Sequence, residues 1–93
     1  MAISFEWDER KRIANAAKHG IDFRDARAIF ENDVIESPSP RHGEERFIAY
    51  GVLERRILAV VFTRKDQTVR LISARRARPY ERKIYRQAFG QGT

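Results

Sequence analysis

The chain contains no cysteine, only two histidines and no long apolar segment. The absence of cysteine excludes a disulfide framework, a thiolate zinc site and a cysteine nucleophile. Two distant histidines do not form a transition-metal ligand set, and no glycine-rich phosphate loop is present, so we expect no metal and no cofactor. The longest apolar run, residues 57–62, is too short to cross a membrane, and no signal peptide precedes it. We therefore expect a cytoplasmic protein.

Acidic residues are scarce in the second part of the chain. Residues 55–93 hold 11 Lys/Arg and 2 Asp/Glu, a net charge of +9, whereas residues 1–54 hold 8 Lys/Arg and 11 Asp/Glu, a net charge of −3. Such an asymmetry indicates a polyanionic partner or an acidic protein partner. A surface that only keeps the protein soluble is the alternative reading of the charge.

The 93 residues are enough for a single small domain, residues 1–93. Residues 4–7 are typical of a short edge strand. Asp8 is a good N-cap for a helix over residues 11–17, with Ile13, Ala14 and Ala17 as its apolar stripe, and Gly20 suits its left-handed end. Asp22 is expected to cap a second helix over residues 23–30.

The remaining pattern predicts strands and one last helix. A strand starts near residues 34–35, and three strands over 46–53, 57–63 and 68–73 follow at hairpin spacing, which favours antiparallel pairing. Ala77 or Pro79 is expected to open a C-terminal helix, in which Pro79 suits the first position. The expected buried face is Tyr80, Ile84, Ala88 and Phe89. The expected fold is α+β: an antiparallel sheet of three to four strands with two N-terminal helices and one C-terminal helix, all packed on one face.

Basic residues follow the ends of the last two strands and the last helix. They are Arg64, Lys65, Arg70, Arg75, Arg76, Arg78, Arg82, Lys83 and Arg86. We expect all except Arg70 to lie close together, where arginine's planar fork and a helix N-terminus suit phosphate. Within this set, Arg82 and Arg86 fit the exposed face of the helix, and Arg64, Arg75 and Arg76 are the candidates for a functional role.

Several other side chains are able to transfer protons or bind phosphate. Lys18 and His19 end the first helix, and Glu45 opens the three-strand segment. A lone histidine at a helix end more often has no task, and a single carboxylate is a weak signal. Together with the arginines, however, these groups fit metal-independent RNA cleavage, in which the 2′-hydroxyl attacks the adjacent phosphate and arginines stabilise the developing charge.

Three blocks of the sequence resemble BrnT-type toxins. The first is Phe5-x-Trp7-Asp8-x-x-Lys11 with Asn15-x-x-Lys18-His19-Gly20-Ile21-x-Phe23 and Ala26-x-x-x-Phe30. The second is Glu44-Glu45-Arg46-Phe47-Ile48-Ala49-x-Gly51. The third is Thr63-Arg64, Arg70-Leu71-Ile72-Ser73-Ala74-Arg75-Arg76-Ala77 and Glu81-Arg82-x-x-Tyr85. The resemblance covers nearly the whole chain, and it departs at Pro79, which shortens the front of the last helix.

The resemblance implies a ribonuclease toxin of a type II toxin–antitoxin system, with a fold like that of RelE toxins. It implies a ribbon-helix-helix antitoxin of the BrnA kind, a 2:2 heterotetramer, and contact with operator DNA through the antitoxin. Free toxin would cut RNA and slow translation and growth. The candidate catalytic positions are Lys18, His19, Glu45, Arg64 and Arg75, and the candidate phosphate-binding positions are Lys65, Arg70, Arg76 and Arg78.

Two other functions remain open from the sequence. In the first, the chain is a non-catalytic module that binds nucleic acid or an antitoxin within an autoregulatory complex. In the second, it is a general RNA-binding protein, which needs aromatic side chains exposed on a strand face. Tyr50 and Phe62 are better suited to the core, which disfavours the second.

Overall fold

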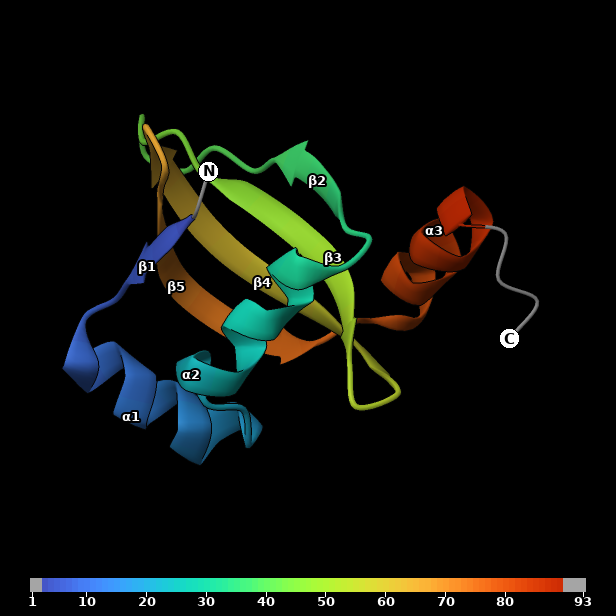
Figure 1. The fold of residues 1–93 in the computed structure, drawn as a ribbon, viewed down its shortest axis with the longest axis horizontal. Coiled ribbons are helices and arrows are strands. Elements are labelled where there is room, and N and C mark those ends of the chain that lie inside the picture. Colours follow the sequence, from blue (N-terminus) through green and yellow to red (C-terminus); the bar gives the residue numbers. More distant parts are fainter. Residues whose placement is uncertain (1–2, 90–93) are drawn as a thin grey trace.

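A computed structural model describes residues 3–89, which form a five-stranded mixed sheet with helices on both of its faces (Figure 1). The strands, in the spatial order β1-β5-β4-β3-β2, are β1 (Ser4–Glu6), β5 (Thr68–Arg76), β4 (Arg56–Lys65), β3 (Phe47–Leu53) and β2 (Ile35–Pro38). The helices are α1 (Glu9–His19), α2 (Phe23–Ala26), which continues into the 3-10 turn η1 (Arg27–Glu31), and α3 (Pro79–Phe89).

The α+β class and the element order are as predicted, but three details of the predicted fold are wrong. The sheet has five strands, and β1 pairs with β5 in parallel, because hairpin spacing constrains only strands that follow each other directly. β2 starts at Ile35, as predicted, and runs to Pro38, where proline is tolerated because β2 is an edge strand. The second helix is shorter than the predicted residues 23–30, since η1 replaces its second half.

Helix α1 has the predicted caps but is longer than the predicted residues 11–17, and it turns a different face inward. The Asp8 side chain accepts the backbone N–H groups of Arg10 and Lys11, and Gly20 adopts the left-handed conformation with φ of 71°. The predicted stripe of Ile13, Ala14 and Ala17 is exposed instead, with Ile13 at 57%. The residues turned toward the body of the protein are Arg12, Asn15, Ala16 and His19, of which Asn15 is buried.

Asn15 holds α1 against the edge of the sheet. Its Nδ2 donates to the carbonyl of Ala74 at 2.8 Å and to that of Ile21 at 2.9 Å, and its Oδ1 accepts the Ala74 N–H at 3.1 Å. Because β1 pairs only with residues 68–70 of β5, the side-chain amide of Asn15 satisfies backbone groups farther along that edge. A polar residue is therefore required at the centre of this helix face.

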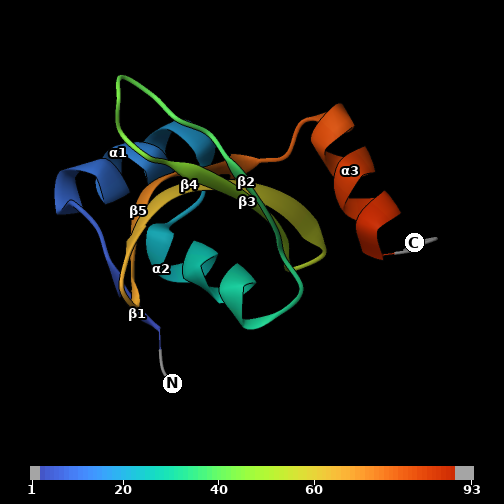
Figure 2. The same cartoon turned by 90° about the horizontal axis from the view of Figure 1, so that it is seen from above.

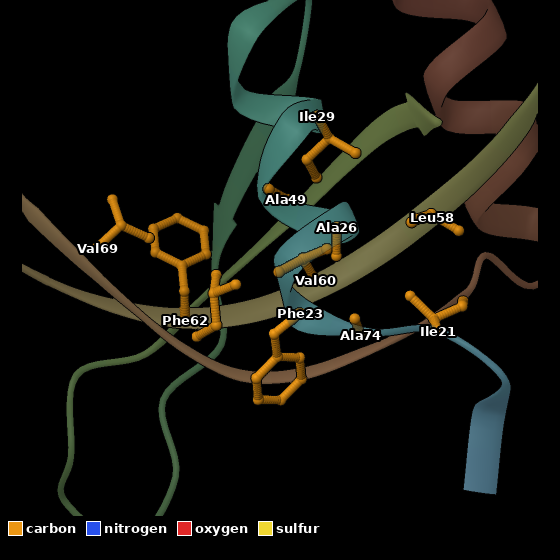
Figure 3. Packing of buried hydrophobic residues seen from close by; sticks show 11 residues of the cluster. Ile21, Phe23, Ala26, Ile29, Ala49, Leu58, Val60, Phe62, Val69 and Ala74 are labelled. Atoms are coloured by element: carbon orange, nitrogen blue, oxygen red, sulfur yellow. The ribbon is translucent and has the colours of Figure 1, made fainter. Parts of the chain in front are cut away.

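The larger apolar core lies between the sheet and the segment formed by α2 and η1. Figure 3 shows Phe23 and Ile29 from this segment against the strand residues Val60 and Phe62, all of which are fully buried. Gly51 of β3 allows η1 to approach closely, since a Cβ there would lie 2.8 Å from the Cβ of Ile29.

Helix α3 packs on the opposite face of the sheet and stands apart from α1 and α2 (Figure 2). Tyr85 and Phe89 form a second, smaller cluster there with Tyr50 and Ala59. The inward residues Glu81, Tyr85 and Phe89 recur at every fourth position. Two predictions are therefore wrong: the helices do not share one face, and the predicted buried residues Tyr80, Ile84 and Ala88 are exposed.

A β-bulge interrupts the pairing of β4 with β5. Val61 pairs with Ser73 and Phe62 with Leu71, which leaves Ile72 without an opposite residue. Arg70 pairs with Thr63 and Arg75 pairs with Ala59, two β4 residues that are four positions apart and hence on the same side of the sheet. The bulge thus brings Arg70 and Arg75 to the α3 face, although their odd spacing would otherwise separate them.

Candidate functional site

The basic residues do not form the single cluster that the sequence suggested. Arg64 pairs with Val69 and Arg75 with Ala59, so Arg64 lies at the β4–β5 turn and Arg75 near the other end of the hairpin. Six residues along β5 separate Val69 from Arg75, which is about 20 Å at the usual rise of a strand. The predicted grouping is wrong because an antiparallel hairpin places the end of one strand beside the start of the next.

Arg64 forms an intramolecular ion pair at the end of the sheet where β4 turns into β5. Its guanidinium donates two hydrogen bonds of 2.9 Å to the carboxylate of Glu36 and lies 5.2 Å from the ring centroid of Phe62. Glu45 is exposed at the same end, because it precedes Phe47, which pairs with Phe62. The structure thus brings Glu45 and Arg64 to one end of the sheet.

Lys65 and Arg70 line a small hollow at this end, on the α3 face. The hollow measures about 330 Å³ and also includes the carboxylates Glu6 and Asp66. Arg70 donates to Glu6 at 3.1 Å. Two basic and two acidic side chains leave this hollow without a net positive charge, so it is a poor match for phosphate.

Arg75 belongs to a buried polar cluster that joins α3 to the sheet. Its guanidinium donates to both carboxylate oxygens of Glu81, at 2.7 Å and 3.0 Å. Glu81 is only 1% exposed, and it also accepts the backbone N–H of Arg78 at 2.7 Å and the hydroxyl of Tyr50 at 3.3 Å. Arg75 therefore neutralises a buried carboxylate, and its guanidinium is already engaged.

The titration of the cluster follows from its contacts. Burial acts to raise the pKa of Glu81, but the hydrogen bonds from Arg75 and from the Arg78 N–H outweigh it and hold the pKa below the usual value. Burial, followed by the charge of Glu81, raises the pKa of Tyr50. At neutral pH the cluster therefore consists of an ionised Glu81, a charged Arg75 and a neutral Tyr50.

Lys18 and His19 lie at the end of α1, away from the arginines of the β4–β5 turn. The two hydrogen bonds from Asn15 Nδ2 place Ile21, just after Gly20, beside Ala74 of β5. The end of α1 is therefore near the Arg75 end of the sheet, where α1 packs along β5. Lys18 is exposed and His19 is half-buried.

Five arginines surround a hollow beside α3, which we call the arginine hollow. It measures about 750 Å³, a size typical of ligand sites. Its charged lining consists of five arginines and one carboxylate: Arg55, Arg56, Arg76, Arg82, Arg86 and Asp33. Its apolar lining consists of Val52, Ile57, Ala77, Tyr85 and Phe89. This arrangement suits an anion that carries a flat or apolar group.

Of the predicted site residues, only Arg76 lines the arginine hollow. The sequence interpretation did not include Arg55 and Arg56 among the candidates, and it assigned Arg82 and Arg86 to the exposed face of the helix. Arg82 is half-buried and donates to the carbonyl of Ala77 at 2.8 Å. The four-residue spacing of Arg82 and Arg86, which places both on one side of a helix, was the available signal.

The β3–β4 turn holds Arg55 in an unfavourable backbone conformation. Leu53 pairs with Arg56, so Glu54 and Arg55 form a two-residue hairpin turn with φ of 51° and 69°. Such turns favour glycine and asparagine, which tolerate positive φ. An arginine kept at such a position, beside four others, is consistent with a functional role for its side chain.

Replacing Arg55 with glycine is expected to raise the free energy of unfolding by about 1 kcal/mol, because glycine adopts the left-handed conformation without strain. Urea denaturation of the two proteins measures this difference. Arg55→Ala is the control, since alanine removes the same side chain and keeps the strain. Equal stability of the glycine and alanine variants would contradict the strain argument.

Two further features concern metals and membranes. Within residues 3–89, no three histidine, cysteine or acidic side chains come together in a group suited to a metal ion. In the same part of the chain, no helix has the length and apolar character needed to cross a membrane.

Comparisons with known proteins agree on one family. Residues 7–81 match the family described as "Ribonuclease toxin, BrnT, of type II toxin-antitoxin system". The structure superposes on the 1.1 Å crystal structure of the Brucella abortus ribonuclease toxin BrnT with a TM-score of 0.64. The two sequences are 32% identical over an alignment that covers 83% of this chain and 99% of the other. No curated protein matches the chain by sequence.

Proposed function

The chain belongs to the BrnT family of ribonuclease toxins of type II toxin–antitoxin systems, and we propose that its arginine hollow holds the phosphate at which RNA is cut. The observation that carries the proposal is the gathering of five arginines and a single carboxylate around one hollow of about 750 Å³. Two of these arginines, Arg82 and Arg86, lie beyond the matched residues 7–81, so their place in the site rests on the geometry.

The proposed reaction needs no bound metal. The RNA 2′-oxygen attacks the adjacent phosphorus, the bond from phosphorus to the 5′-oxygen breaks, and the products carry a 2′,3′-cyclic phosphate and a 5′-hydroxyl. Negative charge builds up on the non-bridging oxygens as the new bond forms. Arginine side chains around the hollow would stabilise that charge through paired hydrogen bonds.

Two proton transfers accompany the reaction, one from the attacking 2′-hydroxyl and one to the leaving 5′-oxygen. Asp33 is the one carboxylate among the described residues that line the hollow, and we assign it the first transfer. Tyr85 is unsuited to that task, because burial raises the pKa of its hydroxyl and keeps it protonated. Lys18, His19 and Glu45 remain candidates for proton transfer, although none of them lines the hollow.

The toxin would act together with an antitoxin that controls it. A type II system includes a protein antitoxin. We propose that this antitoxin is of the ribbon-helix-helix BrnA kind, that it forms a 2:2 heterotetramer with the toxin, and that it carries the contact with operator DNA. Residues 1–93 would act as one toxin domain in the cytoplasm, where free toxin would cut RNA and inhibit translation and growth.

Cleavage of purified RNA tests both the activity and the site. We expect the wild-type protein to cut single-stranded RNA equally well with and without EDTA, and not to cut DNA, which has no 2′-hydroxyl. Arg86→Ala and Arg55→Gly are each expected to lower the cleavage rate by about 10- to 100-fold, since each removes one phosphate contact. Loss of activity in Arg55→Gly, which should be more stable than the wild type, cannot be explained by unfolding.

The matched control is Arg27→Ala, which removes an exposed arginine on η1 and should leave the rate within about twofold. Normal cleavage by both hollow variants would show that the phosphate binds elsewhere, and Arg64→Ala and Arg75→Ala would then be compared. RNA that stays intact with the wild type, in either buffer, would refute the enzymatic proposal. RNA binding without cleavage would support the non-catalytic module.

A further inference from the structure

Helix α3 carries two apolar stripes, and only one of them is covered. The inner stripe, with Tyr85 and Phe89, packs on the sheet. The outer stripe consists of Tyr80, Ile84 and Ala88, which also recur at every fourth position. Tyr80 is 58% exposed and Ile84 is 41% exposed, and both rank among the large apolar side chains that residues 3–89 leave open to solvent.

We propose that the outer stripe of α3 is the docking surface for an acidic, amphipathic helix of the antitoxin. The inference is independent of where RNA binds, because Arg82 and Arg86 turn toward the arginine hollow and the outer stripe lies on another side of the helix. The stripe spans about 12 Å from Tyr80 to Ala88 at the rise of an α-helix. That length accommodates one or two turns of a partner helix crossing it.

The charge around the stripe indicates the sign of the partner. The cations nearest the stripe are Lys83, which is exposed and directly precedes Ile84, and Arg78, which is exposed and precedes the helix. The single carboxylate of α3, Glu81, is buried and bound to Arg75, so it does not offset these charges at the surface. A partner that places carboxylates beside the stripe is attracted to it and oriented on it.

The same charges argue against other occupants. Two copies of this chain that met through the stripe would bring their Arg78 and Lys83 side chains together, and like charges in contact are unfavourable. RNA would stack on Tyr80 alone, since Ile84 and Ala88 provide neither a ring for stacking nor a hydrogen-bond donor. An apolar helix face with acidic flanks satisfies both the stripe and the cations.

Helix α1 provides a matched surface for comparison. Its outer face carries Ile13, which is 57% exposed, together with the exposed Ala14 and Ala17. The surrounding charges of α1 are mixed, because Glu9 and the capping Asp8 accompany its basic residues. Both helices have 11 residues, so a substitution at Ile13 controls for the change made at Ile84.

The test measures binding of the full-length toxin to its cognate antitoxin by titration calorimetry. We expect Ile84→Glu and Tyr80→Glu to weaken the affinity by at least 30-fold, and Ile13→Glu to change it by less than threefold. Affinity should fall as salt rises, since cations of α3 face carboxylates of the partner. Thermal unfolding of each variant confirms that these exposed substitutions leave the fold intact.

Three results would overturn the inference. Wild-type affinity in both Ile84→Glu and Tyr80→Glu would show that the antitoxin does not dock on the stripe. An equal loss in Ile13→Glu would move the docking surface to α1. A free toxin that sediments as a dimer, and as a monomer after Ile84→Glu, would make a second copy the occupant. The readout involves no RNA, so failure of the cleavage proposal would leave this test unaffected.

Discussion

Replacing Glu81 with alanine is expected to lower the free energy of unfolding by about 3 kcal/mol, which is a large part of the stability of a small domain. Glu81 is buried and accepts hydrogen bonds from Arg75, from the Arg78 N–H and from Tyr50. Without the carboxylate, the partly buried Arg75 keeps its charge and has no counter-ion, and the Tyr50 hydroxyl loses its acceptor. Urea denaturation at neutral pH measures the loss.

Glu36→Ala is the matched control, because it also removes the partner of an arginine, Arg64, but at an exposed position. That change should cost no more than about 1 kcal/mol. Equal losses in the two variants would show that burial adds nothing to the Arg75–Glu81 pair. The difference between the unfolding free energies of Glu81→Ala and Glu36→Ala therefore measures what burial adds to the ion pair.

Stability should also depend on pH through Glu81. Because its folded-state pKa lies below the usual value of 4.5, the pair contributes its full stabilisation above that pH, and the contribution is lost as pH falls further. In Glu81→Gln, which cannot ionise, the decrease in stability below pH 4.5 should be shallower than in the wild type. Parallel acid profiles for the two proteins would contradict this assignment.

Replacing Asn15 with leucine is expected to cost about 3–4 kcal/mol, although leucine is apolar and similar in size. Three backbone groups lose their partner, namely the N–H and the carbonyl of Ala74 and the carbonyl of Ile21. Buried backbone groups left without a hydrogen bond each cost about 1–3 kcal/mol, with carbonyls at the lower end. The shift in the urea midpoint at constant slope gives the value.

Ala17→Gln serves as the control for Asn15, because it changes an exposed position of the same helix and should alter stability by less than about 0.5 kcal/mol. Hydrogen exchange adds a local measurement. The Ala74 amide should exchange much faster in Asn15→Leu than in the wild type, whereas amides in the centre of β4 should change only with global stability. Unchanged protection of Ala74 would contradict the bridging role of Asn15.

The sequence predicts both caps of α1 and the starts of α2 and α3 because caps are local. Asp8, Gly20 and Asp22 each act at the predicted position, and α3 starts at Pro79, one of its two predicted starts. Local hydrogen bonds and allowed φ values decide these features, and they involve only neighbouring residues. The three long strands follow in the same way from apolar runs separated by short turns.

The inward faces of α1 and α3 could not be predicted from apolar periodicity. In both helices the residue at the centre of the contact is polar, Asn15 in α1 and Glu81 in α3. Each satisfies groups that are distant in sequence, the free edge of β5 in one case and Arg75 in the other. The apolar positions that remain, such as Ile13 and Ile84, then lie outside, where periodicity alone would place charged residues.

The predicted chemistry of the candidate site and the predicted grouping of its arginines have different outcomes. The excess of arginine in the second part of the chain predicts an anion-binding surface, which stays a prediction, whereas the structure groups other arginines than those expected. The β4–β5 hairpin separates Arg64 from Arg75, and the β3–β4 turn brings Arg55 to the same hollow as Arg86 of α3. Which arginines share the hollow depends on how α3 packs on the sheet, and patterns in a single sequence do not predict that packing.

Because of the bulge at Ile72, the face of the sheet that each β5 side chain occupies depends on the number of residues in the strand as well as on their identity. Deleting Ile72 would restore the regular alternation of side chains along β5. Each side chain from Ser73 to Arg76 would then point to the opposite face of the sheet. Arg75 would then leave Glu81, and Ala74 would turn its methyl group away from the core. A comparison of related sequences that moves a gap by one position at this point would therefore equate residues that face opposite sides of the sheet.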